Sequence, residues 1–349
     1  MKIGSKKIGV DNPCFIIAEL SANHNGDLDT AIETIKAAKK AGADAIKLQT
    51  YTPDTLTIDC DNDYFKIEGG TLWDGKTLYQ LYGEAFTPWE WHFRLFEVAK
   101  EEGLICFSSP FDFTAVDFLE ELEVPAYKIA SFEIQDIPLI AYTASKGKPI
   151  IISTGIADEE DIKLAVETCR SVDNNNIILL KCTSSYPAPL NLANLNTIPD
   201  LKERFNVEVG FSDHTYGSLA PTVAVALGAK IVEKHFILDK AIGGPDADFS
   251  LNVEEFGDMV KKIRDTEKLL GQVSYEISEK VKRNRKFARS LFVIKDAKAG
   301  ELVTKENIRS IRPGYGLHPR HYNDVLGKKL SKDVSKGEPL SYSMIESAK

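Results

Sequence analysis

The sequence is poor in cysteine and has no long hydrophobic run, and each absence excludes a class of protein. Its five cysteines are odd in number, and three of them lie in apolar, strand-like runs. This pattern is typical of small buried side chains rather than of a disulfide framework or a zinc site. No apolar stretch approaches the roughly 20 residues of a membrane span, and the start MKIGSKKIGV lacks the apolar core of a signal peptide. We therefore expect a soluble, cytoplasmic protein that does not bind membranes.

An excess of positive charge is also absent. The chain has 43 Lys and Arg against 52 Asp and Glu, a net charge of −9. This balance argues against nonspecific binding to nucleic acid, because such binding needs many cations facing the phosphates. An anionic small-molecule substrate would therefore need a locally basic pocket. The basic run 279–290 is interpreted as a solvated helix or an anion-facing arm.

Alternating strand and helix patterns fill residues 1–271. Eight short β-branched runs are each followed by a loop and a helical segment. Amphipathic examples are 30–42, 88–103 and 159–170, and the Ala/Leu-rich run 219–229 predicts a helix that ends at Gly228. Eight such units predict a (β/α)8 TIM barrel. A doubly wound open sheet is the alternative, but no glycine-rich dinucleotide motif follows the first strand. The predicted strands are 14–20, 45–50, 104–110, 126–131, 149–154, 176–183, 207–213 and 230–236.

Two regions depart from this rhythm. The aromatic-rich insertion 51–86 follows the second predicted strand. Loops that follow strands shape a barrel's active site, so the insertion is interpreted as a lid. The alternative is a packed loop without a chemical role. After Gly271 a connector at 272–285 leads to a β-rich module at 286–349, which contains the similar phrases DAKAGELVTKENI and DVSKGEPLSYSMI. A module of about 60 residues has only a marginal core, so we expect it to pack on another surface.

Two of the six histidines, His214 and His235, directly follow neighbouring predicted strands. Ligands bind at the carboxyl ends of parallel strands, and two adjacent imidazoles there can share one divalent metal. The alternative is that each histidine only hydrogen-bonds a loop. Mn²⁺, Mg²⁺, Co²⁺ and Zn²⁺ all remain open for such a pair with oxygen ligands.

Other polar residues gather at the same predicted barrel face. Lysines with hydroxyl groups suit a phosphate or carboxylate, and carboxylates suit sugar hydroxyls or general acid/base catalysis. A metal held there could polarise a carbonyl oxygen. These residues are Glu19, Lys47, Gln49, Ser108, Ser109, Lys128, Ser131, Glu133, Ser153, Thr154, Lys181, Ser184, Tyr186, Asp213 and Glu233.

Nine ordered motifs in this chain resemble the sialic acid synthase family. They are AELSANHNGD (18–27), KLQTYTPDTL (47–56), SSPFD (108–112), YKIASFE (127–133), STG (153–155), KCTSSYP (181–187), GFSDHT (210–215), EKHF (233–236) and RPGYG (312–316). The resemblance covers nearly the whole chain and implies a barrel followed by an antifreeze-like (β-clip) domain. The variants SANHNG, TYTPD, LWDG (72–75) and KCTSSYP most resemble the pseudaminic acid branch. The chain departs from the N-acetylneuraminate branch at Ser184, where an asparagine is common.

The resemblance implies that phosphoenolpyruvate condenses with an open-chain acetamido sugar aldehyde to give a nine-carbon 2-keto acid and phosphate. For the pseudaminic branch, the sugar is 2,4-diacetamido-2,4,6-trideoxy-L-altrose. The alternatives are N-acetylmannosamine and its diacetamido analogue, the precursor of legionaminic acid. A divalent metal, Mn²⁺ or Mg²⁺ with Co²⁺ also possible, is implied at His214 and His235.

Roles for individual residues follow from the same resemblance. Glu19 and Glu133 are the implied acid/base residues, beside the two histidines. The resemblance also implies a domain-swapped homodimer, in which Arg312 reaches the sugar's acetamido group in the partner's barrel. The implied phosphoenolpyruvate ligands are Lys47, Ser109, Lys128, Ser131, Ser153, Ser184 and Ser212. The implied sugar contacts are Gln49, Tyr186, Asp246, Phe287 and Arg312.

Two other functions remain as alternatives. A lysine Schiff-base aldolase would use Lys128 or Lys181 as the nucleophile and would need no metal. A non-enzymatic protein would use the C-terminal module to bind ice or carbohydrate. The polar residues at the barrel mouth argue against that second alternative, because an inert barrel does not need them.

Overall fold

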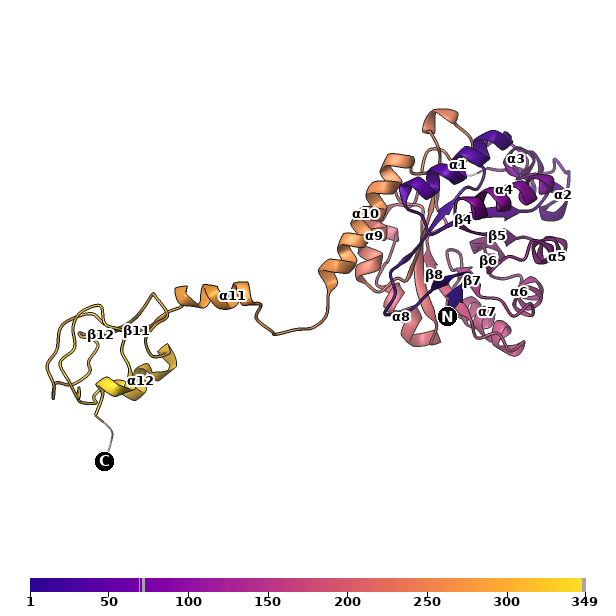
Figure 1. Cartoon of the computed structure of the whole chain (residues 1–349). Helices are drawn as coiled ribbons and strands as arrows, with labels where there is room; N and C mark the ends of the chain where they lie inside the picture. The colour runs from indigo at the N-terminus through magenta and orange to yellow at the C-terminus, as the bar shows by residue number, and fades with distance from the viewer. Residues whose placement is uncertain (69, 71–72, 347–349) are drawn as a thin grey trace. The chain divides into compact units, whose positions relative to one another are not determined.

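Eight parallel strands close a barrel in the computed structural model, which describes residues 1–68, 70 and 73–346 (Figure 1). Around the barrel the hydrogen-bonded order is β10, β3, β4, β5, β6, β7, β8, β9. The strands are β3 (Phe15–Glu19), β4 (Ala45–Thr50), β5 (Ile105–Pro110), β6 (Tyr127–Ile129), β7 (Ile150–Ser153), β8 (Ile177–Cys182), β9 (Glu208–Asp213) and β10 (Ile231–His235). The predicted TIM barrel is confirmed, and each predicted strand matches to within two residues.

The barrel strands are apolar on both faces. In β3, Phe15 and Ile17 belong to the cluster inside the barrel, whereas Ile16 and Ala18 pack against the surrounding helices. This alternation explains why the strands read as continuous hydrophobic runs. The interior is tightly filled, since a Cβ atom at Gly210 would lie 2.5 Å from the carbonyl oxygen of Ile231. The buried interior leaves room for polar side chains only at the strand ends.

A ring of helices covers the outside of the barrel (Figure 1). Several begin at a side-chain cap, such as Asp27 before the first helix and Asp158 before Glu159, which satisfies backbone N–H groups of the first turn. The helix predicted to end at Gly228 ends at Ala226, and Gly228, whose φ is 103°, lies in the turn that follows. The helices are α1 (Leu28–Ala41), α4 (Trp89–Glu101), α5 (Phe113–Glu121), α6 (Ile137–Ala144), α7 (Glu159–Ser171), α8 (Thr197–Phe205), α9 (Leu219–Ala226) and α10 (Val253–Leu270).

Two further features of the first unit, Met1–Gly271, were not predicted as regular structure. A short antiparallel pair joins β1 (Lys2–Ile3) to β2 (Lys6–Lys7). The insertion 51–86 contains α2 (Pro53–Leu56) and α3 (Leu78–Ala85), each opened by a threonine capping box. Leu72 of the LWDG motif lies outside the described residues. None of the helices described is long and apolar enough to cross a membrane.

The second unit, Gln272–Lys349, contains two copies of one backbone motif. The two similar sequence phrases pack on each other, and Ala297 and Val334 exchange backbone hydrogen bonds of 3.1 and 3.0 Å. The Asp296 carboxylate accepts from the Lys336 N–H at 2.7 Å, and Asp333 accepts from the Ala299 N–H at 2.9 Å. The repeat in the sequence therefore corresponds to a structural repeat.

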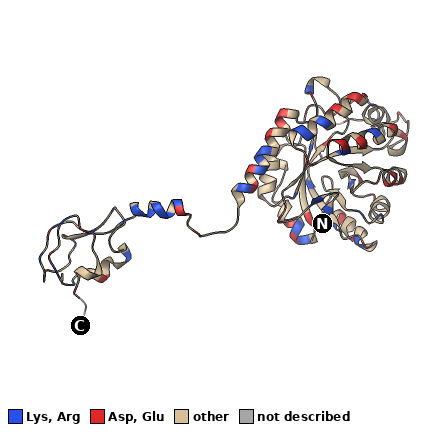
Figure 2. Ribbon diagram, viewed as in Figure 1, with Lys and Arg blue, Asp and Glu red and all other residues tan. Residues whose placement is uncertain are grey.

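Short elements complete this second unit. Strands β11 (Ser290–Val293) and β12 (Ile308–Ile311) pair antiparallel, and α12 (Tyr322–Val325) adds one turn of helix. The predicted connector 272–285 contains α11 (Glu279–Asn284), whose basic residues are coloured blue in Figure 2. All six residues of α11 are exposed. A compact apolar cluster, including Leu291, Val325 and Leu340, supports the β-rich module. Residues 347–349 of the predicted module lie outside the described residues.

Candidate active site

A cavity of about 440 Å³ opens at the carboxyl ends of the barrel strands. Alternate residues near the ends of β3, β4 and β10 point into it, so one barrel face collects side chains that are far apart in sequence. Twelve of the residues predicted for the site line this cavity. They are Glu19, Lys47, Gln49, Lys128, Ser131, Glu133, Ser153, Tyr186, Ser212, His214, His235 and Asp246.

Two residues of the first unit whose roles were implied by the resemblance do not line the cavity. Ser184 lies behind it, where its hydroxyl contacts the Ser131 hydroxyl at 2.9 Å. Ser109 is fully buried near the end of β5, in register with Gln49 of the neighbouring strand. Phe287 and Arg312 belong to the second unit.

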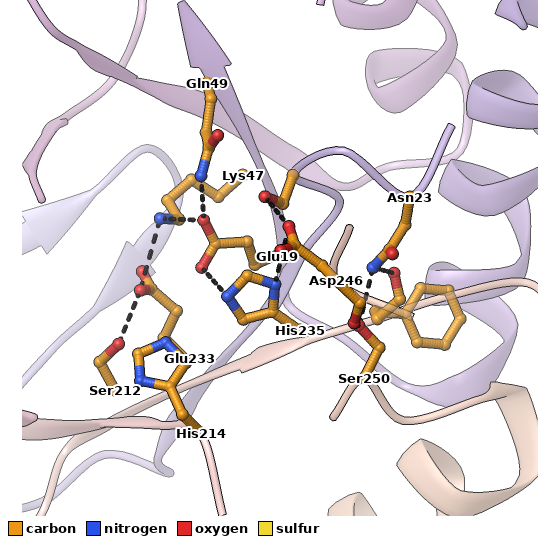
Figure 3. A network of polar contacts seen from close by, with 12 residues as sticks. Glu19, Asn23, Lys47, Gln49, Ser212, His214, Glu233, His235, Asp246 and Ser250 are labelled. Atoms are coloured by element: carbon orange, nitrogen blue, oxygen red, sulfur yellow. Dashed lines mark hydrogen bonds and ion pairs between the residues drawn. The ribbon is translucent and has the colours of Figure 1, made fainter. Parts of the chain in front are cut away.

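A buried network of charges occupies the floor of the cavity (Figure 3). The Lys47 ammonium lies 2.7 Å from Glu19 Oε1 and 3.4 Å from Glu233 Oε1. Gln49 Nε2 donates to Glu19 at 3.1 Å. Burial raises the pKa of Glu19, but the charges of Lys47 and His235 outweigh it and hold that pKa below its usual range. Glu19 is therefore ionised at neutral pH.

Glu233 contacts both lysines; the sequence groups it with the polar residues of the barrel face but assigns it no individual role. Its Oε1 lies 3.6 Å from the Lys128 ammonium and accepts from the Ser212 hydroxyl at 3.0 Å, in addition to its contact with Lys47. Glu233 precedes His235 by two positions on β10, so both point to the same side of the sheet. That alternation is the signal in the sequence that identifies Glu233 as a site residue.

Several buried polar atoms here lack a protein partner. Among the described residues, eight buried side-chain nitrogen or oxygen atoms have no hydrogen-bond partner, and five belong to the cavity or its edge. Buried polar groups are normally satisfied, so this concentration indicates groups that serve a ligand. The five atoms are Ser109 Oγ, Ser153 Oγ, Glu133 Oε2, Glu233 Oε2 and His235 Nδ1.

The two histidines lie beside each other on the cavity wall (Figure 3), with ring centroids 5.3 Å apart. Burial, together with the neighbouring His235, lowers the pKa of His214 to about 3, so its imidazole is neutral at physiological pH. The Thr183 carbonyl, 3.2 Å from His214 Nδ1, accepts a hydrogen bond from the Nδ1–H, so the lone pair of Nε2 is available. His235 Nε2 lies 3.4 Å from Glu19 Oε2.

The SANHNG motif positions the loop that carries Asp246. Ser21 donates to Asp246 Oδ2 at 2.5 Å, and Asn23 donates to the Phe236 carbonyl at 3.0 Å and to Ser250 Oγ at 2.9 Å (Figure 3). Asp246 Oδ2 in turn lies 3.7 Å from His235 Nδ1. The motif therefore fixes a carboxylate beside the histidine pair.

The insertion 51–86 forms an apolar part of the cavity wall. Trp73 donates its indole N–H to the Pro245 carbonyl at 3.3 Å, and its ring lies 5.9 Å from that of Tyr186. The polar floor and this apolar wall face the same space, which suits a ligand with charged groups at one end and apolar groups at the other. The apolar residues contributed by the insertion include Leu56, Ile67, Leu78, Leu81 and Ala85.

Four other strand-end residues grouped with the site from the sequence do not line the cavity. The Ser108 hydroxyl contacts the Thr50 hydroxyl at 2.6 Å, and Thr154 Oγ1 donates to the Leu180 carbonyl at 3.2 Å. Lys181 donates to the neighbouring Cys182 carbonyl and is not among the cavity residues, whereas Cys182 is. Asp213 is buried in an ion pair with Lys234. Lys181 is therefore not placed to act as a Schiff-base nucleophile in this cavity.

Two protein-family models match this chain, one over the barrel and one over the C-terminal module. The model of the NeuB family matches residues 34–275, and the SAF domain model matches residues 288–346, where the sequence predicts the antifreeze-like module. The pseudaminic acid synthase of Campylobacter jejuni is 52% identical over 340 residues, covering 97% of this chain and 98% of that protein.

A second relative and a solved structure are more distant. The N,N'-diacetyllegionaminic acid synthase of Legionella pneumophila is 38% identical, with 98% of each chain covered. The crystal structure of a spore coat polysaccharide biosynthesis protein from Bacillus subtilis is 35% identical, with a TM-score of 0.68 over 100% of this chain and 99% of that one. The chain belongs to the NeuB family.

Proposed function

We propose that this chain is a pseudaminic acid synthase, which condenses phosphoenolpyruvate with 2,4-diacetamido-2,4,6-trideoxy-L-altrose and releases phosphate. The observation that carries the proposal is the full-length identity of 52% to a pseudaminic acid synthase, against 38% to a legionaminic acid synthase. The cavity supports it, because a charged floor that contains two lysines and an apolar wall match a substrate pair with an anionic and an apolar part.

The floor of the cavity would hold phosphoenolpyruvate. Lys47 and Lys128 supply two buried ammonium groups, which offset the charge of the phosphate and carboxylate. The hydroxyls of Ser109 and Ser153 have no protein partner and are available to donate. Ser131, Ser184 and Ser212 complete this proposed set.

His214 and His235 fit a divalent metal. Both imidazoles are buried and side by side, and His235 Nδ1 has no hydrogen-bond partner. No group of three or more histidine, cysteine or acidic side chains in the described parts of the chain is arranged to hold a metal, so the remaining ligands would be oxygens of substrate or water. Bound Mn²⁺ or Mg²⁺, or alternatively Co²⁺, would supply Lewis-acid polarisation of the aldehyde oxygen.

Gln49, Tyr186 and Asp246 would contact the sugar. The wall from the insertion 51–86 suits the C6 methyl group and the acetamido methyl groups, because burying them there removes apolar surface from water. Phe287 and Arg312 would join the site from the second unit of a partner copy in a domain-swapped homodimer. This would give the small second unit the surface that its marginal core needs.

The proposed reaction has three steps. Carbon 3 of phosphoenolpyruvate attacks the aldehyde carbon, water adds to carbon 2, and the C–O bond to phosphate breaks. Glu19 stays ionised and faces the positive charge that develops at carbon 2. Glu133 exchanges protons, since burial raises its pKa to about 7.

The test is phosphate release from phosphoenolpyruvate with Mn²⁺, offering each of three sugars in turn. We expect turnover with the L-altrose derivative and loss of turnover when a chelator is added. Turnover with N-acetylmannosamine or the legionaminic acid precursor instead would move the chain to another branch of the family. Activity that persists in excess chelator, with trapping of the enzyme by borohydride, would favour the Schiff-base aldolase.

A substitution at Gly155 tests whether Ser131 and Ser184 bind phosphoenolpyruvate. A Cβ atom there would lie 2.2 Å from Ser184 Oγ and 2.5 Å from Ser131 Oγ, so Gly155→Ala must separate these hydroxyls. We expect KM for phosphoenolpyruvate to rise about tenfold, the loss of roughly one hydrogen bond, with little change in KM for the sugar. Gly257→Ala on α10 is the matched control, because its nearest neighbour would lie 3.8 Å away. Equal effects on both substrates would contradict the assignment.

A further inference from the structure

A buried ion pair lies directly next to both histidines in the sequence. Lys234 Nζ is 2.7 Å from Asp213 Oδ2, and neither side chain is exposed to solvent. Asp213 precedes His214, and Lys234 precedes His235. The two residues are cross-strand partners in the register of β9 and β10. The ion pair therefore connects the two strand ends that carry the histidines.

This pair faces away from the cavity. The preceding partners in the ladder, Ser212 and Glu233, contact each other on the cavity side, and side chains alternate along a strand. Asp213 and Lys234 are not among the cavity residues. A direct contact with substrate is therefore not their role.

The pair also holds the backbone around His214. Asp213 Oδ1 accepts from the Thr215 N–H at 2.8 Å, and Lys234 Nζ donates to the Thr215 carbonyl. The ion pair therefore holds both the backbone N–H and the backbone carbonyl of Thr215, the residue that follows His214. Two apolar side chains of the same size would fill the space but could not make these backbone contacts.

We infer that Asp213 and Lys234 are positioning residues that set the spacing and orientation of His214 and His235 for a divalent metal. The inference rests on the proposed metal site. Groups that orient metal ligands from behind typically change metal affinity 10- to 100-fold when they are removed. Here the orientation acts through the backbone, since the pair connects the segments adjacent to both imidazoles.

The experiment measures Mn²⁺ binding by calorimetry and by the electron paramagnetic resonance of free Mn²⁺, with the full chain and no substrate. The double variant Asp213→Asn/Lys234→Met removes both charges together, which avoids leaving one buried charge unpaired. We expect its Mn²⁺ affinity to fall 10- to 100-fold, while phosphoenolpyruvate affinity without metal stays within about twofold. An unchanged Mn²⁺ affinity would overturn the inference.

Two more variants separate positioning from stability. Asp213→Glu keeps the charge but moves it by one methylene, so we expect a folded protein with weakened Mn²⁺ binding even where the double variant does not fold. Asp44→Asn is the control. It breaks the ion pairs of Asp44 with Lys6 and Arg264 at the amino ends of the barrel strands, away from the histidines, so we expect lower thermal stability with unchanged Mn²⁺ affinity. A parallel loss of Mn²⁺ affinity in Asp44→Asn would also overturn the inference. Absence of Mn²⁺ binding in the unmodified chain would instead refute the metal site of the proposed function.

Discussion

Lys47→Met is expected to destabilise the protein by about 3–5 kcal/mol and to reduce kcat/KM for phosphoenolpyruvate on the order of 10³-fold. The Lys47 ammonium is the cation nearest Glu19 and also contacts Glu233, and all three side chains are buried. Removing it leaves two carboxylates without their main counter-ion. Chemical denaturation and steady-state kinetics on the same preparation measure the two effects.

The pH dependence of the unfolding free energy tests whether the lost ion pair causes the destabilisation in Lys47→Met. Glu19 has a lowered pKa in the folded protein, so its ion pair contributes stability above its unfolded pKa of about 4.5, and this contribution is lost as pH falls further. Lys47→Met removes that contribution. We therefore expect the stability difference between the two proteins to be largest at neutral pH and to narrow below about pH 4.5. A difference that does not depend on pH would indicate lost packing instead.

Lys128→Met is the matched control for this prediction. The Lys128 ammonium contacts Glu233 at 3.6 Å, whereas Lys47 bridges Glu19 and Glu233, so Glu233 keeps its contacts with Lys47 and Ser212 when Lys128 is removed. We expect turnover to fall strongly and stability to fall by less than in Lys47→Met, because Lys47 still neutralises the remaining carboxylates. A loss of stability as large as that of Lys47→Met would show that the two lysines share the carboxylates equally.

The barrel could be predicted because its signal is local. Each strand is buried on both faces and each helix on one, so a periodicity of two or 3.6 appears in every unit. The end of helix α9 was predicted at Gly228, and the helix ends at Ala226, just before the turn in which Gly228 has a φ of 103°. The short strands β1 and β2 could not be predicted from an apolar pattern, because three of their four residues are exposed lysines.

The contents of the site were harder to predict than its location. Residues near strand ends were grouped together from the sequence, but Lys181 and Asp213 point away from the cavity while Glu233 points into it. Alternation from His235 separates Glu233 from Lys234 along β10, but it does not extend to Lys181 and Asp213, which lie on β8 and β9. No local pattern reveals that Ser21 and Asn23 hold the Asp246 loop, since those contacts span more than 200 positions of the chain.

Glu133→Gln is expected to remove a pH-dependent limb from the activity and to lower kcat about 10²- to 10³-fold. Burial raises the pKa of Glu133 to about 7, and its Oε2 is buried with no protein partner. Glu19 is held ionised at the same time. Two carboxyl groups with pKa values moved apart suit different roles, so protonated Glu133 would donate the proton that the new hydroxyl of the product needs.

The profile of kcat/KM against pH tests this assignment. If protonated Glu133 is the acid, kcat/KM falls as pH rises through about 7, and this descending limb disappears in Glu133→Gln. A base at this position would instead give a limb that rises through the same pH. Persistence of the descending limb in the variant would assign the proton to another group.

Stability gives a second readout that needs no substrate. A carboxyl group with a raised folded pKa stabilises the protein fully below its unfolded pKa of about 4.5, and this contribution is lost as pH rises through about 7. Glu133→Gln carries no charge at any pH, so we expect it to exceed the unmodified protein in unfolding free energy by about 1–2 kcal/mol at pH 8 and to match it near pH 4. The gain is smaller than the full pKa shift implies, because the side chain is partly exposed to the cavity. A carboxyl group that costs stability at the pH where the protein works is retained for its chemistry, not for the fold.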